Sequence, residues 1–188
     1  MPSILLTAPA VEPLSLAEAK AFLRVDNSDE DGVIGALIAG SRIHIEAQTR
    51  RALIAQSWRL SLDSWPLDGR LPVRPAPLRS LTAARVYDAE GVTHDIDTQA
   101  FVLDLASSAL AFAPWALPAP GRIAGGIELD ITAGYGDAAV DVPEPLRQAL
   151  RLLVAHWYEN RGLVASGAVS ALPVNVAALL APYRMLAL

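Results

Sequence analysis

The spacing of apolar residues changes twice along this chain. From about residue 13 to 55 they recur every three to four positions, which predicts helices. From about 56 to 136 they alternate with polar residues, which predicts strands, and after 143 the helical spacing returns. The pattern therefore predicts an α+β fold: a helical bundle built from N- and C-terminal helices, with an inserted antiparallel β region.

Two helices are expected in the first zone. Ser15 and Glu18 have the spacing of a capping box, in which each side chain bonds a backbone amide of the other residue. The acidic stretch 26–32 should start a second helix, with Asn27 or Ser28 as its N-cap. The buried face of that helix is predicted to contain Ile34, Leu37, Ile38, Ser41 and Ile45.

The second zone contains several short strand patterns. Residues 58–62 and 127–131 alternate strictly, and 86–92 has the pattern of a hairpin with a glycine in its turn. The proline-rich stretches 71–77 and 113–121 should be edge strands or loops, because proline cannot donate to a sheet ladder.

The third zone begins with Pro143 and Pro145 at a helix start, followed by a wide apolar stripe. A linker of small residues, 164–170, precedes a short last helix that Pro182 limits. These patterns divide the chain into an N-terminal helical part (1–55), a β-rich insertion (56–136), a helix that completes the bundle (137–163), and a linker with a C-terminal docking segment (164–188).

The C-terminal segment has much apolar surface for its length. It must dock either on its own domain or on another chain, and the small-residue linker makes docking on another chain feasible. Trp115 lies in a proline-rich loop, where core packing is difficult, so it is a candidate protein contact.

Composition excludes several classes of protein. Of the 188 residues, 53% are hydrophobic and 19% charged, which is too apolar for a disordered chain and leaves apolar surface for partner subunits. The net charge of −5 argues against binding the DNA backbone through a basic face. The absence of cysteine excludes disulfides, zinc ribbons and thiol catalysis. No targeting or membrane segment is visible, which favours a soluble protein made in a cytoplasm.

We find no candidate active site. His156 and Glu159 have the spacing of a metal pair on one helix face, but no second cluster accompanies them, and an exposed or interface helix face explains them better. The acidic stretch has Ile38 where a calcium loop needs a carboxylate. We therefore expect no enzyme activity, no metal and no cofactor.

Several ordered segments resemble the head–tail connector (adaptor) family of tailed phages, in the branch that includes the adaptors of gene transfer agents. The segments are 13–25, 46–51, 131–137, 142–150, 157–161 and 172–184. The resemblance implies a virion structural protein that forms a homo-oligomeric ring of roughly a dozen copies below the portal. Such a ring extends the DNA channel and seats a stopper or tail protein.

The resemblance also implies interfaces rather than a catalytic site. Double-stranded DNA would pass without specific binding, no membrane is involved, and the particle would assemble in the bacterial cytoplasm. Trp115 is expected to contact a neighbouring copy or the downstream partner. Deleting 171–188 is expected to abolish portal attachment and leave the fold intact. The candidate portal contacts are Leu172, Pro173, Val176, Leu179, Leu180, Tyr183 and Arg184.

Three alternatives remain open. A stopper or tail-completion protein would be a smaller β barrel without the helical zones. A small metal-dependent hydrolase would use His156 and Glu159 and would bind stoichiometric metal. A packaging factor would bind DNA directly, which the net negative charge disfavours.

Overall fold

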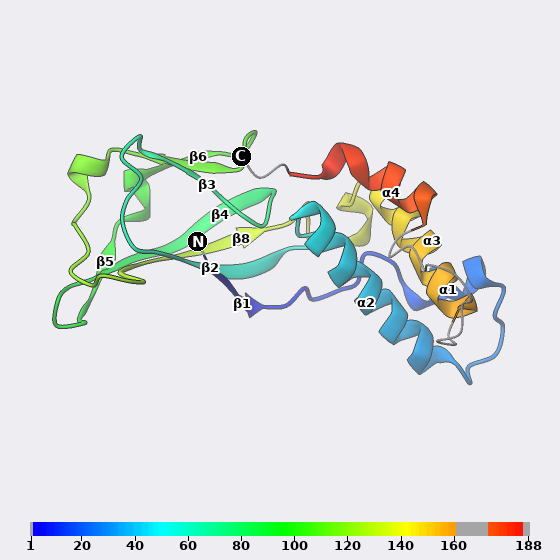
Figure 1. Ribbon diagram of the computed structural model, residues 1–188. Helices are drawn as coiled ribbons and strands as arrows, with labels where there is room; N and C mark the ends of the chain where they lie inside the picture. The colour runs from blue at the N-terminus through cyan, green and yellow to red at the C-terminus, as the bar shows by residue number, and fades with distance from the viewer. Residues whose placement is uncertain (1, 161–172, 186–188) are drawn as a thin grey trace. The chain divides into compact units, whose positions relative to one another are not determined.

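The computed structural model describes residues 2–160 and 173–185 (Figure 1). Its helices and antiparallel sheets confirm the α+β fold. The chain divides into two compact units: a β unit of Met1–Pro9 and Ala55–Gly134, and a helical unit of Ala10–Ile54 and Tyr135–Leu188.

The β unit contains a five-stranded sheet whose neighbouring strands are all antiparallel. Leu60 of β2 (Gln56–Leu62) pairs with Leu129 of β8 (Ile127–Ala133), and Leu129 pairs with Ala84 of β4 (Leu78–Tyr87), so one face of the sheet is apolar throughout its centre. The strands, in spatial order, are β1 (Ser3–Thr7), β2 (Gln56–Leu62), β8 (Ile127–Ala133), β4 (Leu78–Tyr87) and β5 (Thr93–Ile96).

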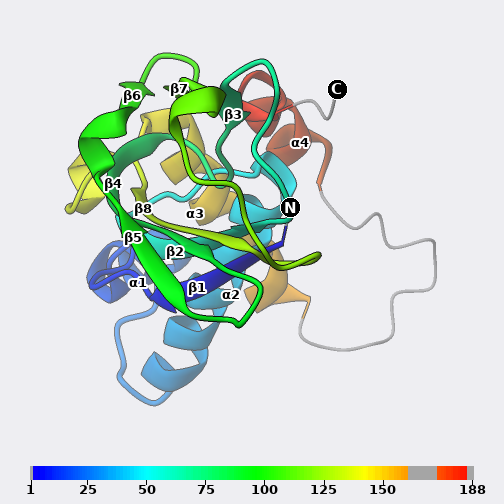
Figure 2. The same ribbon diagram turned by 90° about the vertical axis from the view of Figure 1, so that its left-hand side faces the viewer.

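A three-stranded sheet forms the rest of the β unit (Figure 2). Its order is β3 (Arg70–Pro72), β7 (Ala109–Phe112) and β6 (Phe101–Asp104). Pro72 therefore lies on an edge strand, as predicted for the first proline-rich stretch. The second stretch, also as predicted, is a loop with a short 3-10 helix at Pro114–Ala116.

An aromatic cluster that the sequence pattern did not reveal lies in the core of the β unit. Trp65 is 8% exposed, and its ring centroid lies 5.2 Å from that of Phe112 and 5.9 Å from that of Phe101. Its indole Nε1 donates to the carbonyl oxygen of Pro118 at 2.8 Å. This bond satisfies the only polar atom of a tryptophan side chain that is otherwise covered by apolar groups.

The first strand is a difference from the sequence pattern, which assigned no element before Pro13. β1 pairs with β2 in the β unit, with Ser3 opposite Leu60 and Leu5 opposite Trp58. Its residues Ser3–Thr7 are all exposed, so the strand lacks the alternation of buried and exposed positions that sequence analysis detects.

The helical unit consists of α1 (Leu16–Leu23), α2 (Asp31–Thr49), α3 (Glu144–Glu159) and α4 (Val174–Leu180). The predicted capping box is confirmed: Ser15 Oγ accepts from the amide of Glu18 at 3.2 Å, and the Glu18 carboxylate accepts from the amide of Ser15 at 3.0 Å. Short 3-10 helices lie at Ala139–Asp141 and Ala181–Tyr183 in this unit, and at Thr98–Ala100 in the β unit.

The predicted cap of the second helix is wrong. The N-cap of α2 is Glu30, whose side chain bonds no amide of the helix, and neither Asn27 nor Ser28 occupies that position. The Asn27 carboxamide oxygen instead accepts from the amide of Asp29 at 3.3 Å. Asparagine makes such local turns readily, so its side chain stabilises the preceding loop rather than the helix start.

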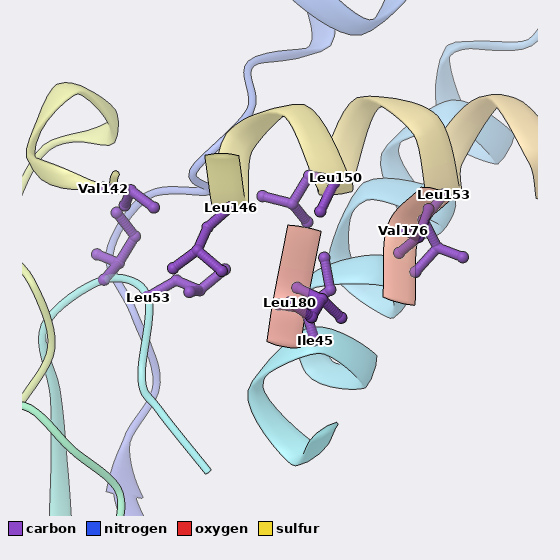
Figure 3. Close-up of a cluster of buried hydrophobic side chains, with 10 residues drawn as sticks. Ile45, Leu53, Val142, Leu146, Leu150, Leu153, Val176 and Leu180 are labelled. Carbon is purple, nitrogen blue, oxygen red and sulfur yellow. The ribbon is translucent and has the colours of Figure 1, made fainter. Parts of the chain in front are cut away.

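The main core of the helical unit joins residues from α2, α3 and α4 (Figure 3). Ile45, Leu150 and Leu180 are completely buried there, and Figure 3 shows Leu180 beside Ile45. A second cluster contains Leu14, Ala19 and Val154 together with Ile34 and Ile38 from the predicted face of α2, whereas Ile45 of that face belongs to the main core. The main core comprises Ile45, Leu53, Ile54, Val142, Leu146, Ala149, Leu150, Leu153, Val176 and Leu180.

Candidate interaction surfaces

The C-terminal segment, Pro173–Met185, docks on its own helical unit. Val176 and Leu180, two of the candidate portal contacts, are completely buried in the main core, so their side chains are not accessible to a partner in this structure. Leu179 and Tyr183 are half-buried and pack against the same core. The sequence left docking in cis or in trans open because apolar spacing indicates that a helix is covered without indicating by which chain.

The remaining candidate contacts differ in exposure. Pro173 is half-buried and Arg184 is exposed, while Leu172 lies outside the described residues. The expectation that the tail can be deleted without cost to the fold is wrong, because its removal would uncover the core that Val176 and Leu180 complete. Contact of the segment with a portal remains a prediction.

Polar contacts hold the C-terminal segment against the end of α2. Arg51 Nε donates to the carbonyl oxygen of Tyr183 at 2.8 Å, and the amide of Met185 donates to the carbonyl oxygen of Thr49 at 3.2 Å. The second bond satisfies a carbonyl that the last turn of a helix leaves without an internal partner. The segment is thus positioned by backbone hydrogen bonds as well as by apolar burial.

Three strongly exposed apolar side chains define a loop surface on the β unit: Leu67 (96% exposed), Trp115 (88%) and Ile123 (98%). Trp115 was the predicted candidate, whereas Leu67 and Ile123 were missed. Both missed residues stand close to glycines in turn sequences, Pro66-Leu67-Asp68-Gly69 and Gly121-Arg122-Ile123, and this signal could have identified them. These three side chains are candidates for a contact with a protein partner, and tryptophan is among the residue types most enriched at the energetic centre of interfaces.

Hydrogen bonds fix the loops that carry these residues to the rest of the β unit. The amide of Phe112 donates to the carbonyl oxygen of Gly69 at 2.9 Å, and the amide of Gly125 donates to an Asp63 carboxylate oxygen at 2.7 Å. The amide of Gly121 donates to the carbonyl oxygen of Tyr87 at 2.8 Å. A Cβ at Gly121 would lie 2.2 Å from the backbone nitrogen of Ala89, so only glycine permits this approach.

A network of ion pairs crosses the polar face of the five-stranded sheet. The Asp130 carboxylate, on a residue only 6% exposed, accepts from Arg59 at 2.7 and 2.8 Å and from Arg85 at 2.7 Å. The hydrogen bond from Arg59 is the main cause that lowers the pKa of Asp130. Arg59 also lies 3.4 Å from Glu128, so both arginines face carboxylates.

Arginines of the helical unit are paired in the same way. Arg42 lies 2.8 Å from Glu12 and 3.0 Å from Glu46. Arg147 lies 2.5 Å from Glu18, which links the capping box of α1 to α3. Such pairing leaves these cations with little positive potential to offer an external phosphate.

Within residues 2–160 and 173–185, no cluster of three or more histidine, aspartate or glutamate side chains is arranged to hold a metal ion. His156, the candidate ligand, has its Nδ1 3.3 Å from the Asn160 side-chain nitrogen. None of the described helices combines the length and apolar character needed to span a bilayer.

Comparison with solved structures gives matches over the full length of the chain. A chain from the neck of an empty gene transfer agent particle, reconstructed with C6 symmetry, is 30% identical with a TM-score of 0.84. A chain from the virion of a native gene transfer agent particle is 29% identical with the same TM-score. A chain from the neck of a native particle, reconstructed with C12 symmetry, is 30% identical with a TM-score of 0.75. Each match covers 100% of this chain and 97% of the other.

These matches define the class of protein: it is a virion structural protein. Neither the comparison with models of protein families nor that with curated proteins gives a match. At this identity and coverage, the chain belongs to the family of neck proteins of gene transfer agent particles.

Proposed function

We propose that the protein is a head–tail connector (adaptor) subunit that forms a ring of roughly a dozen copies below the portal of a phage or phage-like particle. The observation that carries the proposal is the full-length similarity to neck chains in particles reconstructed with C6 and C12 symmetry. The ring extends the DNA channel and seats a stopper or tail protein, and it assembles in the bacterial cytoplasm. The role is structural and needs no catalytic group or cofactor.

The charge of the chain supports passage of DNA without specific binding. A net charge of −5 is repeated in every copy of a ring. Phosphate binding requires unpaired cations, yet Arg42, Arg59, Arg85 and Arg147 are each held by carboxylates of the same chain. These four arginines would therefore attract DNA phosphates only weakly, which supports the proposal that DNA passes without specific binding.

The C-terminal segment supplies the proposed portal contact. Because Val176 and Leu180 are buried, they anchor and position the segment on its own chain, and the accessible residues contact the portal. The accessible side chains are those of Arg184, which is exposed, and of Leu179, Tyr183 and Pro173, which are half-buried. Leu172, which lies outside the described residues, is a further portal contact proposed from the sequence.

The loop surface of Leu67, Trp115 and Ile123 supplies a second proposed contact, with a neighbouring copy or the downstream partner. Loops that are already fixed by hydrogen bonds lose little conformational entropy when a partner binds. An exposed tryptophan in such a setting is the residue type that most often dominates a protein interface.

Binding to an isolated portal complex tests this function and separates an adaptor from a stopper. The full-length chain should co-sediment with portal complexes that contain no other neck protein. Arg184→Glu should weaken binding on the order of tenfold, as expected for an interfacial charge reversal. Arg24→Glu is the matched control, because Arg24 is also exposed and lies in the helical unit, and it should bind as wild type.

Two results would contradict the proposal. A chain that joins the portal only after another neck protein is in place would be a stopper or tail-completion protein. Equal portal binding by the Arg184→Glu and Arg24→Glu variants would show that the C-terminal segment is not part of the portal interface.

A further inference from the structure

The edge strand β1 has an uncommon set of side chains for a strand at the border of a sheet. Ile4, Leu5 and Leu6 are consecutive and are 61%, 43% and 45% exposed. The strand Ser3–Thr7 contains no charge and no proline. Natural edge strands are usually protected by charges, prolines or short length, because an open apolar edge pairs with other chains.

The backbone of β1 is open to pairing at defined atoms. The amide of Ser61 donates to the carbonyl oxygen of Pro2 at 3.1 Å, in register with Ile4 opposite Arg59. In an antiparallel ladder the bonding side alternates with each residue. Ile4 therefore bonds to β2, while Ser3 and Leu5 direct their N–H and C=O groups away from β2, to the open edge.

The opposite edge of the same sheet provides an internal comparison. β5 carries Asp95, whose side chain is 86% exposed, and His94, whose side chain is 56% exposed. Polar and charged side chains of this kind protect an edge from pairing. The side chains of β5 thus protect one edge of the sheet, whereas the side chains of β1 give the other edge no such protection.

We propose that β1 is an interface strand between copies, to which an extended segment of a second copy of this chain adds as a sixth strand. The inference rests on the proposed ring, in which every copy has another copy on each side. The added strand would accept and donate backbone hydrogen bonds at Ser3 and Leu5 and would cover part of Ile4, Leu5 and Leu6.

The uncharged surface favours a second copy over a partner of opposite charge. Each copy carries a net charge of −5, so neighbouring copies repel one another over much of their surface. Contact through a strand without carboxylates avoids this repulsion, and backbone pairing gives affinity without any charge. The register irregularity between Leu5 and Thr7 limits the straight part of the interface to residues 3–5.

Amide hydrogen exchange, read residue by residue by fragmentation mass spectrometry, tests the proposal on the wild-type chain. On passing from free chain to ring, the amides of Ser3 and Leu5 should exchange more slowly, on the order of tenfold or more. The amide of Ile4 is the internal control, because it already bonds to β2 and should change much less. Unchanged exchange at Ser3 and Leu5 in the ring would overturn the proposal.

A photo-crosslinking residue at position 5 identifies which chain pairs with the open edge of β1. In assembled necks, irradiation should give a covalent dimer of this chain. A product with the portal or with another neck protein would overturn the assignment of a second copy.

A matched pair of variants tests the backbone contribution. Leu5→Pro removes the outward amide and Leu5→Ala keeps it, while both remove the leucine side chain. Edge strands accept proline at an outward position, so both variants should fold, as circular dichroism would check. Leu5→Pro should reduce ring formation at least about fivefold relative to Leu5→Ala.

The outcomes separate this proposal from the proposed function. Equal ring formation by folded Leu5→Pro and Leu5→Ala would overturn the interface strand and leave the ring intact. If Leu5→Pro does not fold, the hydrogen-exchange measurement on the wild-type chain decides whether β1 is an interface strand. Failure of the wild-type chain to form a ring with portal would overturn the function, and the interface strand with it.

Discussion

Replacing Leu180 by alanine should destabilise the helical unit, although only eight residues follow it in the sequence. Leu180 is completely buried and packs in the same core as Ile45 and Leu150. Truncating a buried leucine to alanine costs about 2–5 kcal/mol, and more where the surroundings cannot close the cavity. Because α4 is a seven-residue helix that can shift toward the gap, we expect about 2–3 kcal/mol here.

Urea unfolding followed by circular dichroism at helical wavelengths measures this loss. Val174→Ala is the matched control on the same helix, because Val174 is 85% exposed, and it should change the free energy of unfolding by less than about 0.5 kcal/mol. Equal unfolding midpoints for Leu180→Ala and Val174→Ala would refute the reasoning. They would mean that α4 does not pack on its own chain in solution and is free for docking in trans.

Three further predictions concern other parts of the chain. Ser15→Ala removes the acceptor of the Glu18 amide and should lower the free energy of unfolding of the helical unit by about 1 kcal/mol in urea. Asp130→Asn should cost the β unit about 1.5–3 kcal/mol, the value of hydrogen bonds to charged groups. The pKa of Asp130 is lowered in the fold, so the ionised carboxylate stabilises the β unit above the unfolded pKa of about 3.9, and this stabilisation is lost as pH falls through the folded pKa. The urea midpoint of the wild-type chain should therefore fall more steeply between pH 7 and pH 2 than that of Asp130→Asn. Gly121→Ala should lower the melting temperature, because the new Cβ would lie 2.2 Å from a backbone atom. Gly35→Ala is the matched control: a Cβ there has nothing within 4 Å, so this variant should stabilise its helix by about 0.5–1 kcal/mol. Equal melting temperatures for the two variants would contradict this.

Structure that depends on residues close together in the sequence was predicted correctly in most cases. The capping box of Ser15 and Glu18 was predictable because both partners lie within one helical turn. The strand at 127–131 was predictable because one face of it is buried and the other is polar. The cap at Asn27 was wrong because asparagine also stabilises turns, and the sequence alone does not decide between the two uses.

Features that depend on distant partners could not be predicted. β1 has no alternation because all of its residues are exposed, so only its pairing with β2 defines it as a strand. Val176 and Leu180 have the spacing of a covered helix face, but the spacing does not identify the covering chain. Of the loop surface, only Trp115 was identified, because the exposure of Leu67 and Ile123 depends on how the rest of the β unit packs beside their turns.

The central claim is that copies of this chain make a ring that joins the portal to the rest of the neck. Electron cryo-microscopy of purified portal complexes mixed with the full-length chain tests it most directly. The account predicts a closed ring of roughly a dozen copies in direct contact with the portal, with the C-terminal segment of each copy at the contact. Portal complexes that remain bare, or that carry the chain only when another neck protein lies between them, would contradict it.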